Sequence, residues 1–253
     1  MEKLKSILIN LKTLGCVGIK ISFEDEGALL SEHTIMSILT SSLDLDLAIK
    51  IGGCEAKRDI VDCIMLNPTS IVAPMIESKF ALKKYIDSLN QYNFNNKIGF
   101  NLETINAYNN LDSIKEYFGS IDYVTFGRVD FVNSLNKDRK YVDSEEIYEY
   151  VKNVFINARK YNKKCYLGGA ISIDSEDFIL KLNKEQLIDR FETRYVIFDI
   201  NKVIDFNKAI YYANIFELEW MNYIRNIYLS HANKDIKRIE MIEQRVNKNV
   251  ITS

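Results

Sequence analysis

The sequence has few of the residues that mark several large classes of protein. Its 253 residues include only two prolines, two histidines and one tryptophan. Basic and acidic residues nearly balance, 33 against 35, so the formal charge is −2 and supplies no positive field for holding a phosphate backbone. No run of about 18 uncharged apolar residues is present, as a membrane span would need. We therefore expect neither a nucleic-acid partner nor a membrane partner.

Metal knuckles, nucleotide loops and export signals are also missing. The four cysteines are scattered and no two stand at C-x-x-C spacing: Cys16, Cys54, Cys63 and Cys165. The first residues lack the apolar segment of a signal peptide, and reduced thiols are typical of a cytoplasmic protein, which is the localisation we expect. No glycine-rich phosphate loop occurs. Neither His33 nor His231 ends a predicted strand, which argues against a histidine base or zinc site.

What the sequence does contain is a regular alternation of short β-type runs and longer amphipathic stretches. The runs predict strands over 16–23, 47–52, 70–76, 97–102, 122–127, 164–170 and 194–200. The stretches predict helices near 32–43, 55–66, 78–91, 104–118, 144–162, 175–184 and 186–192. Several helices begin at good capping residues, namely Ser31, Ser78, Thr104 and Ser144. This β-α rhythm predicts a parallel sheet with helices outside it.

A closed barrel explains the polar residues better than an open sheet does. Periodicity alone fits both, but polar side chains follow five successive predicted strands, and in a barrel all strand ends meet at one face. We predict an α/β fold, a TIM-type (β/α) barrel over residues 1–202. Because 2–13 predicts a helix before the first strand, this barrel is one strand short at its start. Residues 203–253 predict a long, unusually apolar helical extension that packs on the barrel and on another subunit of a homo-oligomer.

Two carboxylates form the leading candidate site. Glu103 and Asp130 follow neighbouring predicted strands, in NLET and GRVD, so both would face one cavity. Paired carboxylates are the usual protein ligands of Mg²⁺ or Mn²⁺. The alternative is that each carboxylate only complements a helix dipole.

Further charged residues stand close to predicted strand ends. Glu24, Asp25 and Glu26 follow the first strand and are either a solvated loop or part of a site. Lys50 lies within AIKIGG, and a lysine on a buried strand needs a partner. Lys20 also lies on a predicted strand, and either lysine could form a Schiff base.

The order of these motifs resembles the HpcH/HpaI aldolase and citrate lyase β-subunit family. The resemblance covers about residues 15–200, in order and with the right gaps. ISFEDEG is similar to the strand of that family that ends in an acidic pair, AIKIGG stands where the family has Val-Arg, and NLET is similar to its metal-binding Glu-Thr strand. IVAPMIES and IDYVTFGRVDFVNSL resemble the two remaining family segments.

The resemblance implies a phosphoenolpyruvate/pyruvate-type TIM barrel that makes or breaks carbon–carbon bonds with Mg²⁺ or Mn²⁺. It implies that Glu103 and Asp130 bind the metal, and that Asn101 and Gly127 contact an anionic small-molecule substrate. Glu24 and Asp25 would hold metal-bound water.

Three departures from the family pattern affect the expected chemistry. Lys50 stands at the family's arginine and lacks its bidentate fork, Asp25 stands at the aldolase branch's histidine, and Arg128 replaces a proline or glycine beside the metal carboxylate. Arg128 would either supply the missing guanidinium or fill the site. The leading hypothesis is a metal-dependent lyase or aldolase acting on an α-keto acid or acyl-CoA-type substrate, in which Lys50 and Arg128 neutralise the substrate and its enolate. The alternative is a catalytically degenerate barrel that serves as a binding or assembly protein.

Overall fold

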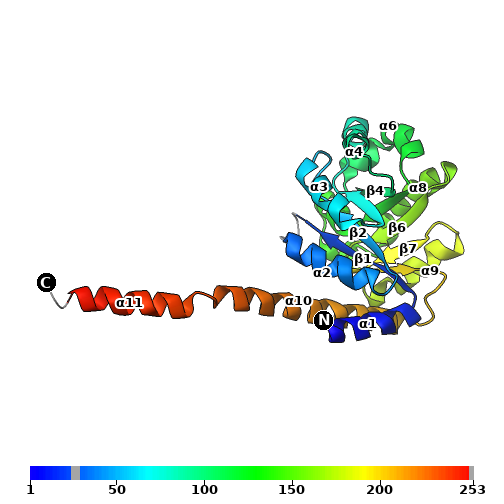
Figure 1. The fold of residues 1–253 in the computed structure, drawn as a ribbon. Coiled ribbons are helices and arrows are strands. Elements are labelled where there is room, and N and C mark those ends of the chain that lie inside the picture. The colour runs from blue at the N-terminus through cyan, green and yellow to red at the C-terminus, as the bar shows by residue number, and fades with distance from the viewer. Residues whose placement is uncertain (24–28, 251–253) are drawn as a thin grey trace.

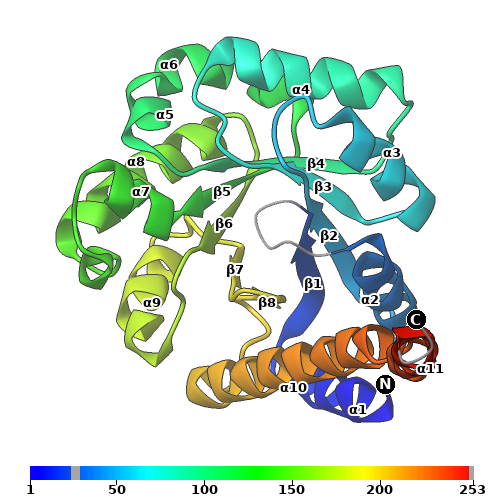
Figure 2. The same cartoon turned by 90° about the vertical axis from the view of Figure 1, so that its left-hand side faces the viewer.

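The computed structural model is a closed barrel with helices around it (Figures 1 and 2). It describes residues 1–23 and 29–250, and side chains among these through residue 247. The strands follow one another around the barrel in chain order: β1 (Cys16–Ser22), β2 (Asp46–Lys50), β3 (Ser70–Ala73), β4 (Lys97–Leu102), β5 (Tyr123–Gly127), β6 (Lys164–Gly168), β7 (Arg190–Glu192) and β8 (Val196–Asp199). The predicted TIM-type α/β barrel is confirmed.

A short hairpin joins β7 to β8. The other successive strands are connected by helices, and helices surround the barrel. They are α1 (Glu2–Thr13), α2 (Leu30–Ser41), α3 (Lys57–Leu66), α4 (Lys79–Gln91), α5 (Ile105–Asn109), α6 (Leu111–Ile114), α7 (Arg128–Ser134), α8 (Glu145–Lys160), α9 (Glu176–Lys184), α10 (Phe206–Ala232) and α11 (Ile236–Val250), with 3₁₀ turns η1 (Lys115–Ser120), η2 (Arg139–Tyr141) and η3 (Ile173–Ser175). The predicted caps Ser78, Thr104 and Ser144 each accept a backbone N–H. Ser31 does not cap α2, which begins one residue earlier, after Leu29.

The end of the barrel differs from the prediction. β1 to β7 are parallel, but β8 runs antiparallel to both β7 and β1 and closes the barrel between them. The last strand, β8, thus occupies the place beside β1 where the prediction lacked a strand. The helix predicted over 186–192 is wrong, because Arg190–Glu192 forms β7, which pairs with β8. Phe191 and Phe198 are partners in this pairing, and their rings stack with centroids 5.1 Å apart. Helix α7, which no pattern predicted, occupies the connection after β5.

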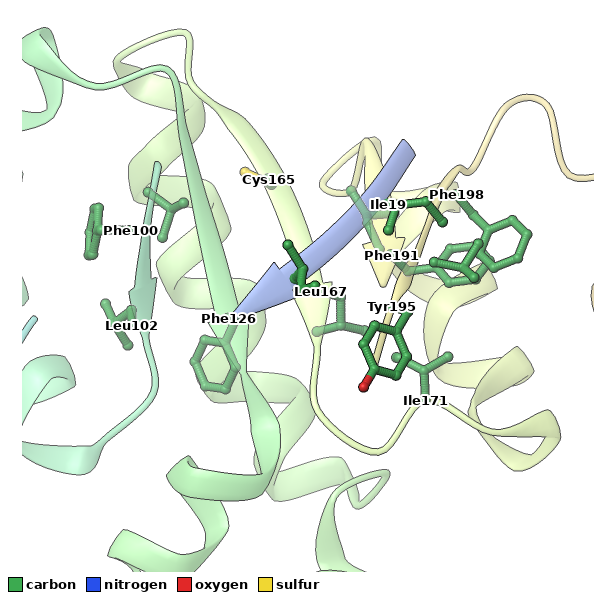
Figure 3. Packing of buried hydrophobic residues seen from close by; sticks show 14 of the residues in the cluster. Ile19, Phe100, Leu102, Phe126, Cys165, Leu167, Ile171, Phe191, Tyr195 and Phe198 are labelled. Atoms are coloured by element: carbon green, nitrogen blue, oxygen red, sulfur yellow. The ribbon is translucent and has the colours of Figure 1, made fainter. Parts of the chain in front are cut away.

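The strands have an apolar outer face, and the barrel interior is apolar near the strand starts and polar near the strand ends. Outward residues such as Ile19, Phe100, Phe126 and Phe198 are fully buried against the helices (Figure 3). Inside, a small apolar cluster fills the half near the strand starts: Ala48, Val72, Tyr123, Tyr166 and Ile197. Strand alternation turns the residues nearer the strand ends inward as well, and these are polar or small: Lys20, Ser22, Lys50, Asn101, Glu103, Thr125, Gly127, Gly168 and Glu192. TIM barrels are ordinarily filled by bulky apolar layers, so this half is available for a site.

The C-terminal segment is two helices, not the single helix predicted from residue 203. α10 lies alongside α1 against the barrel, and the buried face of α10 includes Phe216 and Trp220 (Figure 2). Because β8 is reversed, α10 begins at the barrel end where the parallel strands start and runs toward the end where they finish. α11 continues beyond the barrel on that side (Figure 1). Four of its apolar side chains are exposed: Ile236, Ile239, Ile242 and Val246. Among the described residues, no helix has the length and apolar character to cross a membrane.

The packing of α10 generates a stability prediction. Trp220 is 1% exposed, whereas the adjacent Met221 is 56% exposed. We expect Trp220→Ala to lower the free energy of unfolding by about 3–5 kcal/mol, because it opens a cavity between α10 and the barrel. Met221→Ala should change it by about 0.5 kcal/mol or less. Denaturant unfolding of the two variants measures both values, and equal effects would show that α10 is not part of the core.

Candidate functional site

The candidate site lies at the carboxyl ends of the parallel strands. Glu103 directly follows β4, Asp130 stands in the first turn of α7 after β5, and Lys50 ends β2. Both Lys50 and Asp130 act electrostatically on the Glu103 carboxyl. The structure therefore brings together these three predicted residues, as expected from strand ends that meet at one face of a barrel.

Glu103 is held in place by two hydrogen bonds although it is only 4% exposed. The Met75 backbone N–H donates to Oε1 at 2.9 Å, and the Asn101 side-chain amide donates to Oε2 at 3.0 Å. Asn101 is thus a positioning residue for the carboxylate, where the sequence predicted a substrate contact. These bonds fix the direction in which the remaining lone pairs of the carboxylate point.

The backbone around Glu103 is shaped to receive its side chain. Met75 adopts a left-handed conformation, φ 51°, which is unfavourable for a residue with a side chain, and this places its N–H on Glu103. Gly127, whose predicted substrate contact stays a prediction, also makes room for Glu103. A Cβ at Gly127 would lie 2.6 Å from Glu103 Oε2, so the absence of a side chain makes room for the carboxylate.

Burial is the main influence on the Glu103 carboxyl. It raises the pKa above its ordinary value near 4.5, and the hydrogen bond from Met75 and the charge of Lys50 oppose this rise, whereas the charge of Asp130 adds to it. A buried carboxylate next to a second acid is stabilised by any cation between them. The two acids are therefore an unfavourable arrangement in the protein alone.

The donor set fits a hard divalent cation. Mg²⁺ is usually held by one or two carboxylates, and water or substrate oxygens complete the octahedron. Glu103 and Asp130 supply two carboxylates, and the part of the chain that the structure describes contains no group of three or more Asp, Glu, Cys or His side chains placed to hold a metal ion. A metal here would have to keep several positions for water or substrate, as a catalytic site requires.

Arg128 does not join this site, which corrects the prediction that it neutralises substrate. Its guanidinium is fully buried and ion-paired with Asp143, and it donates to the Gly169 carbonyl at 2.9 Å and to Ser175 Oγ at 3.2 Å. It also lies over the Phe178 ring, 5.0 Å from its centroid. The side chain fastens α7 to the segment after β6.

Two predicted residues lie outside the described part of the chain. Glu24 and Asp25 precede residue 29, where the description resumes, so their role with metal-bound water stays a prediction. Conversely, sequence reasoning missed Met75, whose left-handed backbone no residue type announces, and Glu192, which it had assigned to a helix.

The comparisons with known proteins support the fold. No protein-family model and no curated protein matches the sequence. Among solved structures, the citrate synthase SbnG matches with a TM-score of 0.62 at 12% identity, covering 92% of this chain and 89% of that one. An HpcH/HpaI aldolase from Desulfitobacterium hafniense matches with a TM-score of 0.60 at 12% identity, covering 76% and 82%.

A third match is an HpcH/HpaI aldolase/citrate lyase family protein from Burkholderia cenocepacia. The TM-score is 0.59 at 11% identity, and the matched region covers 75% of this chain and 82% of the Burkholderia cenocepacia chain. The resemblance read from the motifs is confirmed at the level of fold. The match to SbnG covers 92% of this chain, and the unmatched remainder is shorter than α10 and α11 together. Part of α10 or α11 therefore lies within the matched region.

The raised pKa of Glu103 predicts a pH-dependent gain in stability for Glu103→Gln. Without a cation, the native state disfavours the carboxylate, so this cost is absent below the ordinary pKa near 4.5 and grows as the pH rises through the raised pKa. We expect Glu103→Gln to increase the free energy of unfolding at pH 7, because it removes the buried carboxylate. At pH 4 the gain should vanish.

Denaturant unfolding in metal-free buffer at both pH values tests this expectation. Glu116→Gln is the matched control, because its carboxylate is 55% exposed in a surface ion pair and should give no such gain. Loss of stability in Glu103→Gln at pH 7 would contradict the assigned pKa direction.

Proposed function

We propose that this protein is a divalent-metal-dependent carbon–carbon lyase or aldolase that acts on an α-keto acid or an acyl-CoA-type substrate. The observation that supports the proposal best is the buried Glu103 carboxylate, held by Met75 and Asn101 and coupled to Asp130 and Lys50. This arrangement lies at the catalytic end of a barrel whose structural matches are named as aldolase and citrate synthase.

Each residue has a distinct role in this proposal. Glu103 and Asp130 would hold Mg²⁺ or Mn²⁺, which when bound stabilises the enolate that carbon–carbon cleavage leaves behind. Met75 and Asn101 keep the Glu103 carboxylate in one orientation. Lys50 places an ammonium at the end of β2, where it attracts the anionic substrate and opposes the developing negative charge.

The position of the Arg128 guanidinium limits which side chain can supply positive charge to the substrate. Because the Arg128 guanidinium is occupied by Asp143 and by backbone carbonyls, it does not replace the arginine of the family pattern. Lys50 is then the cation at the end of β2, and a lysine binds a carboxylate as a point charge without bidentate geometry. The protein should accept a wider range of substrate orientations than an arginine-bearing relative.

Metal-dependent activity tests the proposal. We expect the purified protein to release pyruvate or another α-keto acid from a 4-hydroxy-2-oxo acid only with Mg²⁺ or Mn²⁺ present. Glu103→Gln and Asp130→Asn should each reduce kcat/KM by roughly a hundredfold or more, because each removes a metal ligand. Arg128→Lys should affect stability more than kcat/KM.

Thermal unfolding supplies an independent readout of the same site. Mg²⁺ or Mn²⁺ should raise the Tm of the native protein by mass action and should not raise that of Glu103→Gln. If neither cation changes the Tm and no aldol or acyl-CoA substrate is cleaved, the proposal is wrong.

A second candidate function, a barrel that acts as an assembly partner, is favoured by α11. Its apolar side chains recur at spacings of three and four residues, and all are exposed: Ile236, Ile239, Ile242 and Val246. Such a stripe is typical of a helix that packs on another helix. An assembly role through this stripe is compatible with catalysis in the barrel.

The stripe predicts a homo-oligomer that depends on α11. We expect light scattering after size exclusion to give a multiple of 29.4 kDa, and Ile239→Glu combined with Ile242→Glu to give the monomer mass. Gln244→Glu, an exposed polar position on the same helix, is the control and should leave the assembly intact. A native protein that runs as a monomer at micromolar concentration would exclude this assembly.

A further inference from the structure

Two buried glutamates lie over a pair of glycines in the barrel wall. A Cβ at Gly127 would lie 2.6 Å from Glu103 Oε2, and a Cβ at Gly168 would lie 3.1 Å from Glu192 Oε1. The two glycines pair in register on the neighbouring strands β5 and β6. The two carboxylates therefore occupy adjacent positions inside the barrel, at the end where the parallel strands finish.

Glu192 is held by a contact from the other side of the barrel. The residue is 5% exposed, and Lys20 of β1 reaches it across the interior, so that Lys20 Nζ donates to Glu192 Oε1 at 2.8 Å. A charge-assisted hydrogen bond of this kind fixes the orientation of a carboxylate. The Glu192 side chain thus has a defined direction although it stands at the end of a strand of only three residues.

One oxygen of Glu192 is left for a ligand. Oε2 accepts no hydrogen bond from the described residues and, unlike the enclosed Ser22 Oγ, keeps a small accessible surface. A carboxylate oxygen that is largely buried without a partner is costly. Oε2 is therefore an acceptor that a hydroxyl group of a ligand inside the barrel would satisfy.

The cleavage chemistry requires an acid–base group in this region. Among the described inward residues near the strand ends, four side chains can ionise: Lys20, Lys50, Glu103 and Glu192. In the proposed function, Glu103 holds the metal and Lys50 attracts the anionic substrate. Breaking a carbon–carbon bond next to a hydroxyl also requires a group that takes up the hydroxyl proton. Of these four side chains, Lys20 and Glu192 remain for that task.

We propose that Glu192 is the general base of the carbon–carbon cleavage and, once protonated, the acid that completes it. The proposal rests on the proposed function and adds a catalytic residue to it. Oε2 of Glu192 contacts the substrate hydroxyl, and Lys20 is a positioning residue that holds Oε1. The adjacent positions of Glu103 and Glu192 place both carboxylates along one bound substrate.

Protons and electrons balance in this scheme without a further reactant. Glu192 takes the proton of the C4 hydroxyl of a 4-hydroxy-2-oxo acid, and the electron pair of the O–H bond forms the C4 carbonyl. The C3–C4 bond breaks, its electron pair forms the enolate of the keto acid, and the aldehyde leaves. Glu192 then returns the proton to C3, which restores the carboxylate and its ion pair with Lys20.

A Schiff base is the competing role for Lys20. A nucleophilic lysine must lose its proton, and the Glu192 carboxylate at 2.8 Å stabilises the protonated form. The contact therefore favours a lysine that stays charged. Trapping with borohydride in the presence of pyruvate should leave the mass of the protein unchanged, and an adduct on Lys20 would overturn the roles given to this pair.

Proton exchange at C3 of pyruvate tests the role of Glu192. Enolisation and reprotonation of pyruvate are the second half of the reaction, and proton NMR in D₂O follows them without the aldehyde. With saturating Mg²⁺, we expect the native protein to exchange the methyl protons. Glu192→Gln should lower the exchange rate by roughly a hundredfold or more, because it removes the acid and base. The Kd of pyruvate, measured by calorimetry with Mg²⁺, should stay within about twofold.

Further variants separate a chemical role from a structural one. Glu192→Asp keeps a carboxylate and should retain part of the exchange rate that Glu192→Gln loses. If Glu192→Gln fails to fold because Lys20 is left unpaired, Lys20→Met combined with Glu192→Gln removes both charges and should show the same loss. Asp46→Asn is the matched control, because Asp46 pairs with Arg190 of the same strand β7 at 2.8 Å but at the opposite end of the barrel. Its exchange rate should stay close to that of the native protein.

The outcomes separate this inference from the proposed function. Exchange that needs Mg²⁺ and Glu103 but continues at the native rate in Glu192→Gln would overturn the role of Glu192 and leave the lyase proposal intact. Pyruvate that binds with Mg²⁺ and exchanges no protons would do the same. Exchange that needs Glu192 but neither Mg²⁺ nor Glu103 would uphold the role of Glu192 and overturn the metal-dependent proposal. If pyruvate does not bind, with or without Mg²⁺, the role of Glu192 is overturned, and the cleavage assay decides the lyase proposal.

Discussion

The barrel depends on one unusual pairing, that of β8 with both β7 and β1. Seven parallel strands in succession leave two unpaired edges, and buried edges are costly because each N–H and C=O needs a partner. The short hairpin from β7 to β8 supplies a strand for both edges at once, at the expense of reversing its direction. The Lys20 N–H is part of this closure, because it donates to the Tyr195 carbonyl at 2.7 Å.

The reversal has consequences at both ends of the barrel. A parallel final strand would end at the site face, whereas β8 ends at the opposite face, and α10 therefore starts there. α10 must run back along the barrel toward the site end, where it packs against α1 and continues into α11. Because β8 is reversed, α11 thus projects from the end of the barrel that carries the candidate site.

The β-α rhythm of the sequence predicted the strands and helices, and the polar residues at successive strand ends favoured a closed barrel over an open sheet. Near-continuous apolar runs such as LAIKIG and DYVTFG predict strands covered on both faces, and the polar residues after them converge as expected. The caps Ser78, Thr104 and Ser144 followed from residue type, because their side chains bond to backbone nearby in sequence. The strand runs and helix caps depend on residues close together in sequence, so residue type and spacing were enough to predict them.

The features that escaped prediction depend on contacts between distant segments. β7 has three residues, too few to show a period, and it exists because β6 and β8 pair with it. Arg128 stands two residues before Asp130 in sequence, but the direction of its side chain is decided by Asp143 and Phe178, which belong to later helices and loops. The pairing of Lys20 with Glu192 joins residues 172 positions apart, and no spacing rule relates them.

The use of Arg128 in packing determines the chemistry left for the interior. Because its guanidinium contacts the segment after β6, the positive charges near the strand ends, among the described interior residues, come from Lys20 on β1 and Lys50 on β2. A lysine ammonium has three N–H donors on a flexible stem and can follow a substrate as it changes shape, whereas an arginine fixes both oxygens of one carboxylate. Glu192 restores part of the lost precision by holding the Lys20 ammonium at one place.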